Sequence, residues 1–352
     1  TTLKPPPEKL PEGRVLEKAK QVVEDIRADR LVNIGWEEGV SEDVKTGLLA
    51  MRRSLCAAVE RLAMDLYADE CHCLWELIQN ADDNKYASDT GIPELTLALE
   101  VDEEYGAYVL TSNNEVGLSF EDVRAICNVN ASLKGAGQTG HKGIGWKSVF
   151  RISDCPHVLS NAFAFKFDSR GPLGKLALVT PANLSEEEIE ALPAPVRKAK
   201  AAGNTVMFLP LRSKSDALAV DAELHQIAAQ LLCLAFLRRL RRLQLRFLKG
   251  SMILQRSEAD MAKLHFPGAS NLVAVRITEF TEAGDQSRTQ TPEYVLHHHD
   301  VALESETVAL SLAFPVAFAL EATQAEEDDE LFKAPLQPLF TFLPIKVVGF
   351  RF

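Results

Sequence analysis

The sequence lacks any hydrophobic run long enough to cross a bilayer. Its longest apolar stretches, such as residues 231–237, fall well short of the roughly 20 residues that a membrane-spanning helix needs. The chain begins with Thr-Thr-Leu-Lys and three prolines, without a starting Met or the apolar core of a secretory signal. We therefore expect an excised or processed piece that enters no membrane.

Cysteine is sparse, and an excess of basic residues is absent. The six cysteines are scattered among apolar neighbours, unlike those of a secreted disulfide scaffold, which favours a cytoplasmic or nuclear protein. A net charge of −12 gives no general attraction to nucleic acid or anionic lipid. The 352 residues, 46% of them hydrophobic, are enough for two ordinary cores, so a soluble globular protein is expected.

The order of the predicted elements indicates an α/β sandwich with a mixed sheet rather than repeating βαβ units. Hydrophobic spacing predicts helices over residues 15–28, 44–66, 72–83 and 120–129, a surface helical insert over 185–202, and a helix over 217–240. It predicts strands over residues 94–100, 107–111, 163–167, 175–179, 205–209, 243–248, 339–343 and 347–352. A glycine-rich stretch lies between the helix over 120–129 and the third strand.

The Ser/Lys-rich segment 212–215 is the expected domain boundary. We expect an N-terminal extension with a helix over residues 1–43, a first domain over 44–212 and a second α/β domain over 213–352. The acidic run 326–330 is typical of a loop. Because the chain stops inside a strand-like pattern, we expect the second domain to be truncated.

One predicted helix carries a polar stripe with catalytic potential. Glu76, Asn80 and Asp83 are spaced i, i+4 and i+7 and so share a face. Magnesium prefers oxygen ligands and keeps several waters, so Asn80 could be its single protein ligand, while the Glu76 carboxylate could deprotonate a water. Taken alone, the segment favours the alternative of a solvated stripe on an amphipathic helix.

A glycine-rich segment follows at residues 140–148, which read Gly-His-Lys-Gly-Ile-Gly-Trp-Lys-Ser. Gly140, Gly143 and Gly145 allow positive φ and a close approach of the backbone to an anion, and the helix that follows favours phosphate at its amide end. Lys142 and Lys147 could add positive charge. A mobile glycine loop without a ligand remains the alternative.

Together these segments resemble the GHKL (Bergerat) ATPase superfamily, which includes the gyrase B subunit, the ninety-kilodalton heat-shock chaperones, MutL and histidine kinases. Residues 76–80, 113–117, 140–145 and 203–205 come in the order of its four sequence boxes. Residues 77–86 and 140–150 are most similar to the sacsin and plant NO VEIN branch. The match covers roughly residues 48–212 and is looser afterwards, although residues 342–344 resemble a motif near the end of the sacsin-type module.

The resemblance implies an ATP-binding GHKL sandwich followed by a transducer-like domain. It implies that Glu76 is the general base, Asn80 the Mg²⁺ ligand, Gly140, Gly143 and Gly145 the triphosphate loop, and Thr205 an adenine contact. Asp83 would lie either on the ribose side or one contact away from the ligand. Histidine kinases typically lack the base at the Glu76 position, so hydrolysis is favoured over phosphoryl transfer. Lys346 and Arg351 are candidates for a γ-phosphate contact from the second domain.

The second box departs from the superfamily pattern. With Gly117 in register, Asn113 stands where the family has an aspartate that accepts the adenine amino proton. A neutral amide forms a weaker hydrogen bond than a carboxylate. The lid between residues 128 and 140 is also short, which limits closure over ATP.

These features leave three functions open. A slow Mg²⁺-dependent ATPase would act as a chaperone-like or assembly-regulating machine, with nucleotide, protein clients or assembly partners, and a possible homodimer. A non-catalytic scaffold of the same fold is the alternative. A nucleic-acid-acting relative of MutL rests only on the cluster Arg238-Arg239-Leu240-Arg241-Arg242, for which we favour helix-end and ion-pair roles.

Two signals typical of metal sites are set aside. Cys71-His72-Cys73 places alternate ligands on different sides of a helix, with no second pair at suitable spacing. His297-His298-His299-Asp300 is interpreted as a solvated loop.

Overall fold

The computed structural model describes residues 12–30, 32, 41–67, 73–128, 145–230, 233–258, 272–283, 286–291, 293–302, 307–315, 338–341 and 343–347. Its α-helices are α1 (Glu12–Asp29), α2 (Glu42–Tyr67), α3 (Cys73–Asp83), α4 (Phe120–Cys127), α5 (Glu186–Ala191), α6 (Ala194–Ala201), α7 (Lys214–Ala229) and α8 (Cys233–Phe236). Two 3₁₀-helices, η1 (Gly145–Arg151) and η2 (Gly174–Val179), join them.

The first six strands are β1 (Glu94–Asp102), β2 (Gly106–Asn113), β3 (His157–Ser160), β4 (Phe163–Lys166), β5 (Ala182–Asn183) and β6 (Thr205–Pro210). The later strands are β7 (Arg242–Arg246), β8 (Ser251–Glu258), β9 (Leu272–Ala283), β10 (Gln286–Gln290), β11 (Glu293–Ala302), β12 (Thr307–Pro315), β13 (Pro338–Thr341) and β14 (Leu343–Val347). The expected hairpin, the helical insert and the strand β6 are confirmed.

One mixed sheet organises the chain. Its strand order is β12-β11-β9-β8-β7-β1-β2-β6-β3-β4-β5, with β10 added beside β9, and β13 and β14 form a separate pair. Strands β1 and β7 run parallel, whereas β1 with β2 and β2 with β6 are antiparallel. The expected α/β fold with a mixed sheet is therefore confirmed, and the sheet runs on across residue 212.

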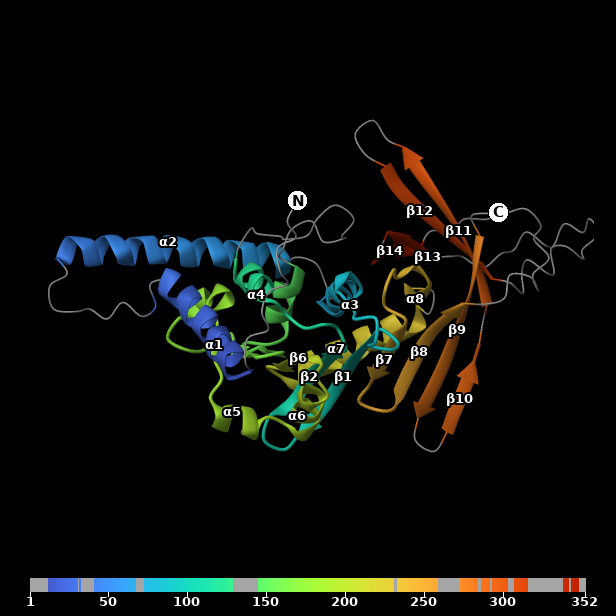
Figure 1. The fold of residues 1–352 in the computed structure, drawn as a ribbon, viewed down its shortest axis with the longest axis horizontal. Coiled ribbons are helices and arrows are strands. Elements are labelled where there is room, and N and C mark those ends of the chain that lie inside the picture. The colour runs from blue at the N-terminus through green and yellow to red at the C-terminus, as the bar shows by residue number, and fades with distance from the viewer. Residues whose placement is uncertain are drawn as a thin grey trace, which may run out of the picture.

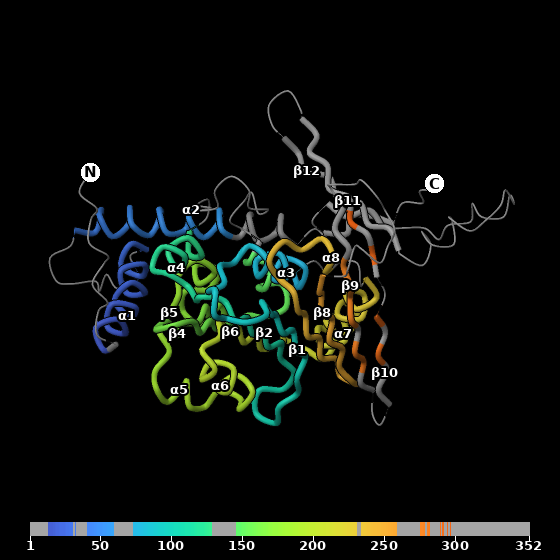
Figure 2. The backbone as a smooth tube through the Cα atoms, turned by 45° about the vertical axis from the view of Figure 1, so that its right-hand side comes forward, coloured from blue at the N-terminus to red at the C-terminus, as the bar shows by residue number. Residues whose placement is uncertain are grey.

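Alternate residues of the central strands supply two separate cores. In β1, Leu95, Leu97 and Leu99 face the core that contains α3 and α7, whereas Ala98 faces the core that contains the insert helix α6. Such alternation is the period-2 pattern of a strand buried on both faces. Figures 1 and 2 accordingly show α3 and α4 on the opposite side of the strands from α5 and α6.

Three predicted elements differ from the structure. The expected strand over 175–179 is the 3₁₀-helix η2, whose residues 176–179 are all buried, and a continuous apolar run does not distinguish the two periods. Residues 297–300 lie in β11 and not in a loop. The single helix expected over 217–240 is divided into α7 and α8.

Among the described helices, none combines the length and the apolar character that spanning a bilayer requires. No disulfide joins the described cysteines Cys56, Cys73, Cys127 and Cys155.

The carboxylate of Asp82 joins α3 to the start of β7. It accepts hydrogen bonds from three consecutive backbone amides, those of Arg238 at 2.9 Å, Arg239 at 2.7 Å and Leu240 at 2.8 Å. In a continuous helix these amides would bond to carbonyls one turn earlier. The bonds to Asp82, which is only 6% exposed, explain why helical structure does not continue beyond α8 to residue 240.

We expect Asp82→Asn to lower the free energy of unfolding by about 2 to 4 kcal/mol, because an amide loses the charge and places an NH₂ group against a buried N–H. Urea unfolding followed by circular dichroism measures the change. Asp89→Asn, in an exposed turn, is the matched control and should stay within about 0.5 kcal/mol of wild type. Equal effects of the two substitutions would contradict the role of Asp82.

Candidate functional site

Helix α3 presents one partly open polar side. Most of its residues are buried, and Glu76, Gln79 and Asn80 are half-buried. The predicted base and the predicted magnesium ligand therefore lie one turn apart on the same side of α3. Asp83 differs, because its side chain is only 4% exposed and forms an ion pair with Arg238 at 3.3 Å.

Asn113 ends β2 next to the end of α3. Its Nδ2 donates to the Tyr86 hydroxyl at 2.8 Å and to the carbonyl of Glu94 at 2.7 Å, while its Oδ1 accepts from Asn84 Nδ2 at 3.1 Å. Burial raises the pKa of Tyr86, which stays neutral and donates to the carbonyl of Ala81 at 2.7 Å. These bonds connect α3 to the end of β2 from which Asn113 and the second sequence box extend.

Thr205 lies directly opposite Asn113 in the β2–β6 register, so the two predicted adenine contacts are neighbours. The Thr205 and Ser160 hydroxyl oxygens are 2.6 Å apart, and Ser160 Oγ accepts from the Leu118 amide at 2.8 Å. Glu115 lies beside this network, and the proximity of Thr205 acts to lower the pKa of its carboxyl group.

Glu115 is a candidate site residue that the sequence prediction did not include. The residue is 9% exposed, and its Oε1 is fully buried without a hydrogen-bond partner in the part of the chain that the structure describes. Burial raises its pKa to about 7, although Thr205 acts in the opposite direction. One signal could have identified it, because Glu115 is the single charged residue between Ala107 and Leu118.

Gly117 occupies a position that only glycine tolerates. Its φ is +87°, and a Cβ there would stand 2.2 Å from Asn161 Nδ2. Asn161 in turn donates to the carbonyls of Val116 at 3.2 Å and Leu118 at 3.4 Å. The glycine thus lets the β3–β4 turn close directly onto the second sequence box.

The end of the predicted phosphate loop lies against α3, because η1 begins at Gly145 and packs on that helix. Gly140, Lys142 and Gly143 fall outside the described residues. The Lys147 ammonium is buried and donates to the carbonyls of Ile126 at 2.7 Å and Leu178 at 3.4 Å. Burial lowers the pKa of Lys147 to about 8.

The arginine cluster is engaged within the protein. Arg239 donates to the carbonyls of Asp83 and Asn84, and Arg241 donates to those of Leu237 and Leu240. Arg238, Arg242 and Arg246 form ion pairs with Asp83, Glu94 and Glu100, respectively. The cluster begins two residues after the end of α8 and runs through a bend into β7, so the expected pairing with local acids next to a helix end is confirmed. In the part of the chain that the structure describes, no group of three His, Cys, Asp or Glu side chains is placed to hold a metal.

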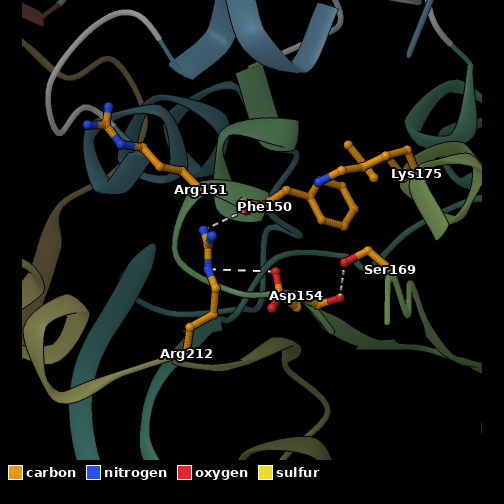
Figure 3. Close-up of a pocket in the computed structure, with 7 residues that line it drawn as sticks. Phe150, Arg151, Asp154, Ser169, Lys175 and Arg212 are labelled. Atoms are coloured by element: carbon orange, nitrogen blue, oxygen red, sulfur yellow. Dashed lines mark hydrogen bonds and ion pairs between the residues drawn. The ribbon is translucent and has the colours of Figure 1, made fainter. Parts of the chain in front are cut away.

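A pocket of about 290 Å³ lies beyond η1. Its lining residues are Phe150, Arg151, Asp154, Ser169, Lys175, Leu178 and Arg212, none of which was a predicted site residue. Figure 3 shows Arg212 extending toward the Phe150 carbonyl, to which it donates at 3.0 Å, with Asp154 beside its Nε at 3.6 Å. The Arg151 guanidinium points away from both partners.

Residues 54–249, more than half of the chain, match the sacsin domain family. The chain belongs to the sacsin domain family. It is also 32% identical over 341 residues to Protein NO VEIN of Arabidopsis thaliana, a match that covers 94% of this chain and 11% of that protein's length. The predicted similarity to the sacsin and NO VEIN branch is thus confirmed.

A solved structure described as the N-terminal domain of a DNA repair protein matches this sacsin-family chain with a TM-score of 0.33 and 11% identity. The match covers 62% of this chain and 70% of that one. A similarity this low does not establish a shared fold or function.

Stability should fall as the pH rises from about 4.5 to about 7, because folded Glu115 keeps a proton that the unfolded chain releases in that range. Across this pH range the contribution of Glu115 to the free energy of unfolding changes by about 3 kcal/mol at most. Glu115→Gln should remove this share of the dependence, which urea unfolding at several pH values measures. Burial also raises the pKa of Glu223 to about 7, so the variant retains the part of the pH dependence that Glu223 contributes.

Glu103→Gln, in the exposed β1–β2 turn, is the control for this titration and should keep the wild-type pH dependence. An unchanged slope in Glu115→Gln would show that Glu115 ionises normally.

Proposed function

We propose that this sacsin-family chain binds Mg²⁺ and ATP on a GHKL-type sandwich and hydrolyses ATP slowly. One observation carries the proposal: α3, with Glu76 and Asn80, packs against η1, which begins at Gly145 at the end of the glycine-rich segment. The four sequence boxes are separated along the chain, and the described parts of three of them meet around α3 and the ends of β2 and β6.

We assign the nucleobase to the part of the site where the end of β2 meets the beginning of β6. Asn113 and Thr205 face each other across the two strands, and Glu115 adds a buried carboxyl group beside Thr205. The fully buried Oε1 of Glu115 has no hydrogen-bond partner among the described residues, and a buried acceptor in this state favours a ligand N–H donor. An exocyclic amine of a purine is a donor of this kind.

The phosphates are assigned to Gly140, Gly143 and Gly145 with Lys142, and Mg²⁺ to Asn80. The half-buried side of α3 fits this role, since an amide oxygen and a carboxylate one turn apart suit a hydrated hard cation. Bound Mg²⁺ would neutralise charge on the phosphates. Glu76 would orient the attacking water and accept its proton, while Asp83 is a ribose-side contact in the same assignment.

We further propose that nucleotide state changes the conformation of the chain, in a chaperone-like or assembly-regulating role with protein clients, partner subunits or a second copy of itself. The second half, residues 213–352, would act as the transducer-like domain. Its strand β7 joins the sheet beside β1, which places the two halves in one framework.

A non-catalytic scaffold is the second candidate, and the bonds of Asn113 favour it. Both hydrogens of its amide are donated within the protein, and its oxygen already accepts from Asn84. A residue so engaged contributes less to a ligand than an aspartate free to accept would.

Titration with MgATP should raise the melting temperature saturably, because a ligand that binds only the folded state stabilises it. Glu76→Ala should keep that shift and lose turnover by about 100-fold or more, measured as phosphate release. Glu121→Ala, which removes an exposed carboxylate from the first turn of α4, is the matched control and should leave turnover unchanged.

A saturable shift without turnover in the wild type would establish the scaffold instead of the enzyme. Turnover that survives Glu76→Ala would refute the assignment of Glu76 as the general base.

A further inference from the structure

Helix α3 depends on a distant residue at its beginning. The first amides of a helix have no partner within it, and the positive end of the helix favours an acceptor there. The amide of Leu74 donates to Glu223 Oε1 at 3.2 Å, and the Cys73 thiol lies 3.9 Å from Glu223 Oε2. Glu223 belongs to α7, so an element of the second half supplies an acceptor for the first turn of α3.

Glu223 is one of the most deeply buried ionisable residues described, with 2% of its surface exposed. Burial raises its pKa to about 7, while the Leu74 amide, the charge of Arg151 and the Cys73 thiol lower it. Arg151 ends η1 and Cys73 begins α3, so these groups face Glu223 from both elements. A buried carboxyl is costly unless it is hydrogen-bonded, which makes its placement here specific.

The other end of α3 is held by the same half of the chain. Asp82 binds the amides of residues 238–240, so α3 is fixed to α7 at its beginning and to the turn before β7 at its end. Leu74 and Asp82 are eight residues apart, a rise of about 12 Å along the helix axis. A shift of α3 along its axis must strain at least one of these two attachments.

We propose that Glu223 is a positioning residue for the nucleotide site, which holds the first turn of α3 and thereby sets the location of Glu76. The inference rests on the proposed hydrolysis of ATP. Glu76 comes two residues after Leu74, so a change in the first turn moves the base relative to the phosphates. A displacement of about 1 Å in a reacting group can lower the rate by about 100-fold.

The kinetic test compares Glu223→Gln, which keeps the size of the side chain and one acceptor oxygen but loses the charge, with the wild type. We expect kcat to fall by about tenfold and KM for ATP to change by less than about twofold, since the misplaced base affects turnover more than binding. The wild-type pH–kcat profile should contain a step near the pKa of Glu223, and the variant should lose it. Glu190→Gln, on the exposed face of α5, is the control and should match the wild type.

A second measurement does not depend on activity. Above about pH 8, where Glu223 of the wild type is ionised, hydrogen–deuterium exchange of the Leu74 amide should be faster in Glu223→Gln than in the wild type. Below about pH 6 the two exchange rates should be closer to each other. Glu223→Asp keeps the charge on a shorter side chain. It should also exchange faster at residue 74 while it retains the step in the pH profile.

The outcomes separate this inference from the proposed function. Unchanged kcat in Glu223→Gln, with or without faster exchange, overturns the positioning role. A parallel rise in KM and fall in melting temperature, without loss of the pH step, overturns it as well and indicates a structural contact alone. A wild-type chain that neither binds nor hydrolyses MgATP refutes the ATPase itself, and the exchange of Leu74 then decides whether Glu223 anchors α3.

Discussion

The structure depends on a single buried carboxylate that binds three backbone amides in a row. Asp82 closes the turn over residues 238–240, and that turn delivers β7 to its place beside β1. Backbone N–H groups that are buried need partners, and a side-chain acceptor from another element supplies them here. The helix that carries the candidate catalytic residues is therefore also the element that fixes where the second half of the chain enters the sheet.

The same helix has two chemically distinct sides. Glu76 and Asn80 are half-buried, whereas Asp82 and Asp83 are buried against residues 238–240. An acidic pair at the end of α3 thus holds two parts of the fold together, while the residues one and two turns earlier are the half-buried ones that the proposed function assigns to the ligand. Because both sets share eleven residues of rigid backbone, a change at one of them is transmitted to the other.

Local sequence patterns predicted the elements whose residues alternate or recur regularly. The strands β1, β2 and β6 and the helices α1 to α4 follow this rule. Gly117 was expected only as the register position of the second box, and its φ of +87° is a finding of the structure. The failures share a different cause. Strands β8 to β12 were not expected as a set, and the helix over 217–240 was extended too far. In the structure α7 ends at Ala229, and residues 238–240 bond to Asp82, about 150 residues earlier, instead of continuing a helix. Glu115 was missed because counting back from Gly117 selected Asn113, whereas the contact of Glu115 with Thr205 is visible only in three dimensions.

The parallel pairing of β1 with β7 also bears on how the chain can be divided. The two strands are far apart in sequence, and β7 covers the edge of β1 that β2 leaves open. A fragment cut at residue 212 would expose that row of unpaired amides and carbonyls, a surface prone to edge-to-edge association. A cut after β7 would open the edge that pairs with β8 instead, so neither the compositional break at residues 212–215 nor the end of β7 divides the sheet without leaving a strand uncovered.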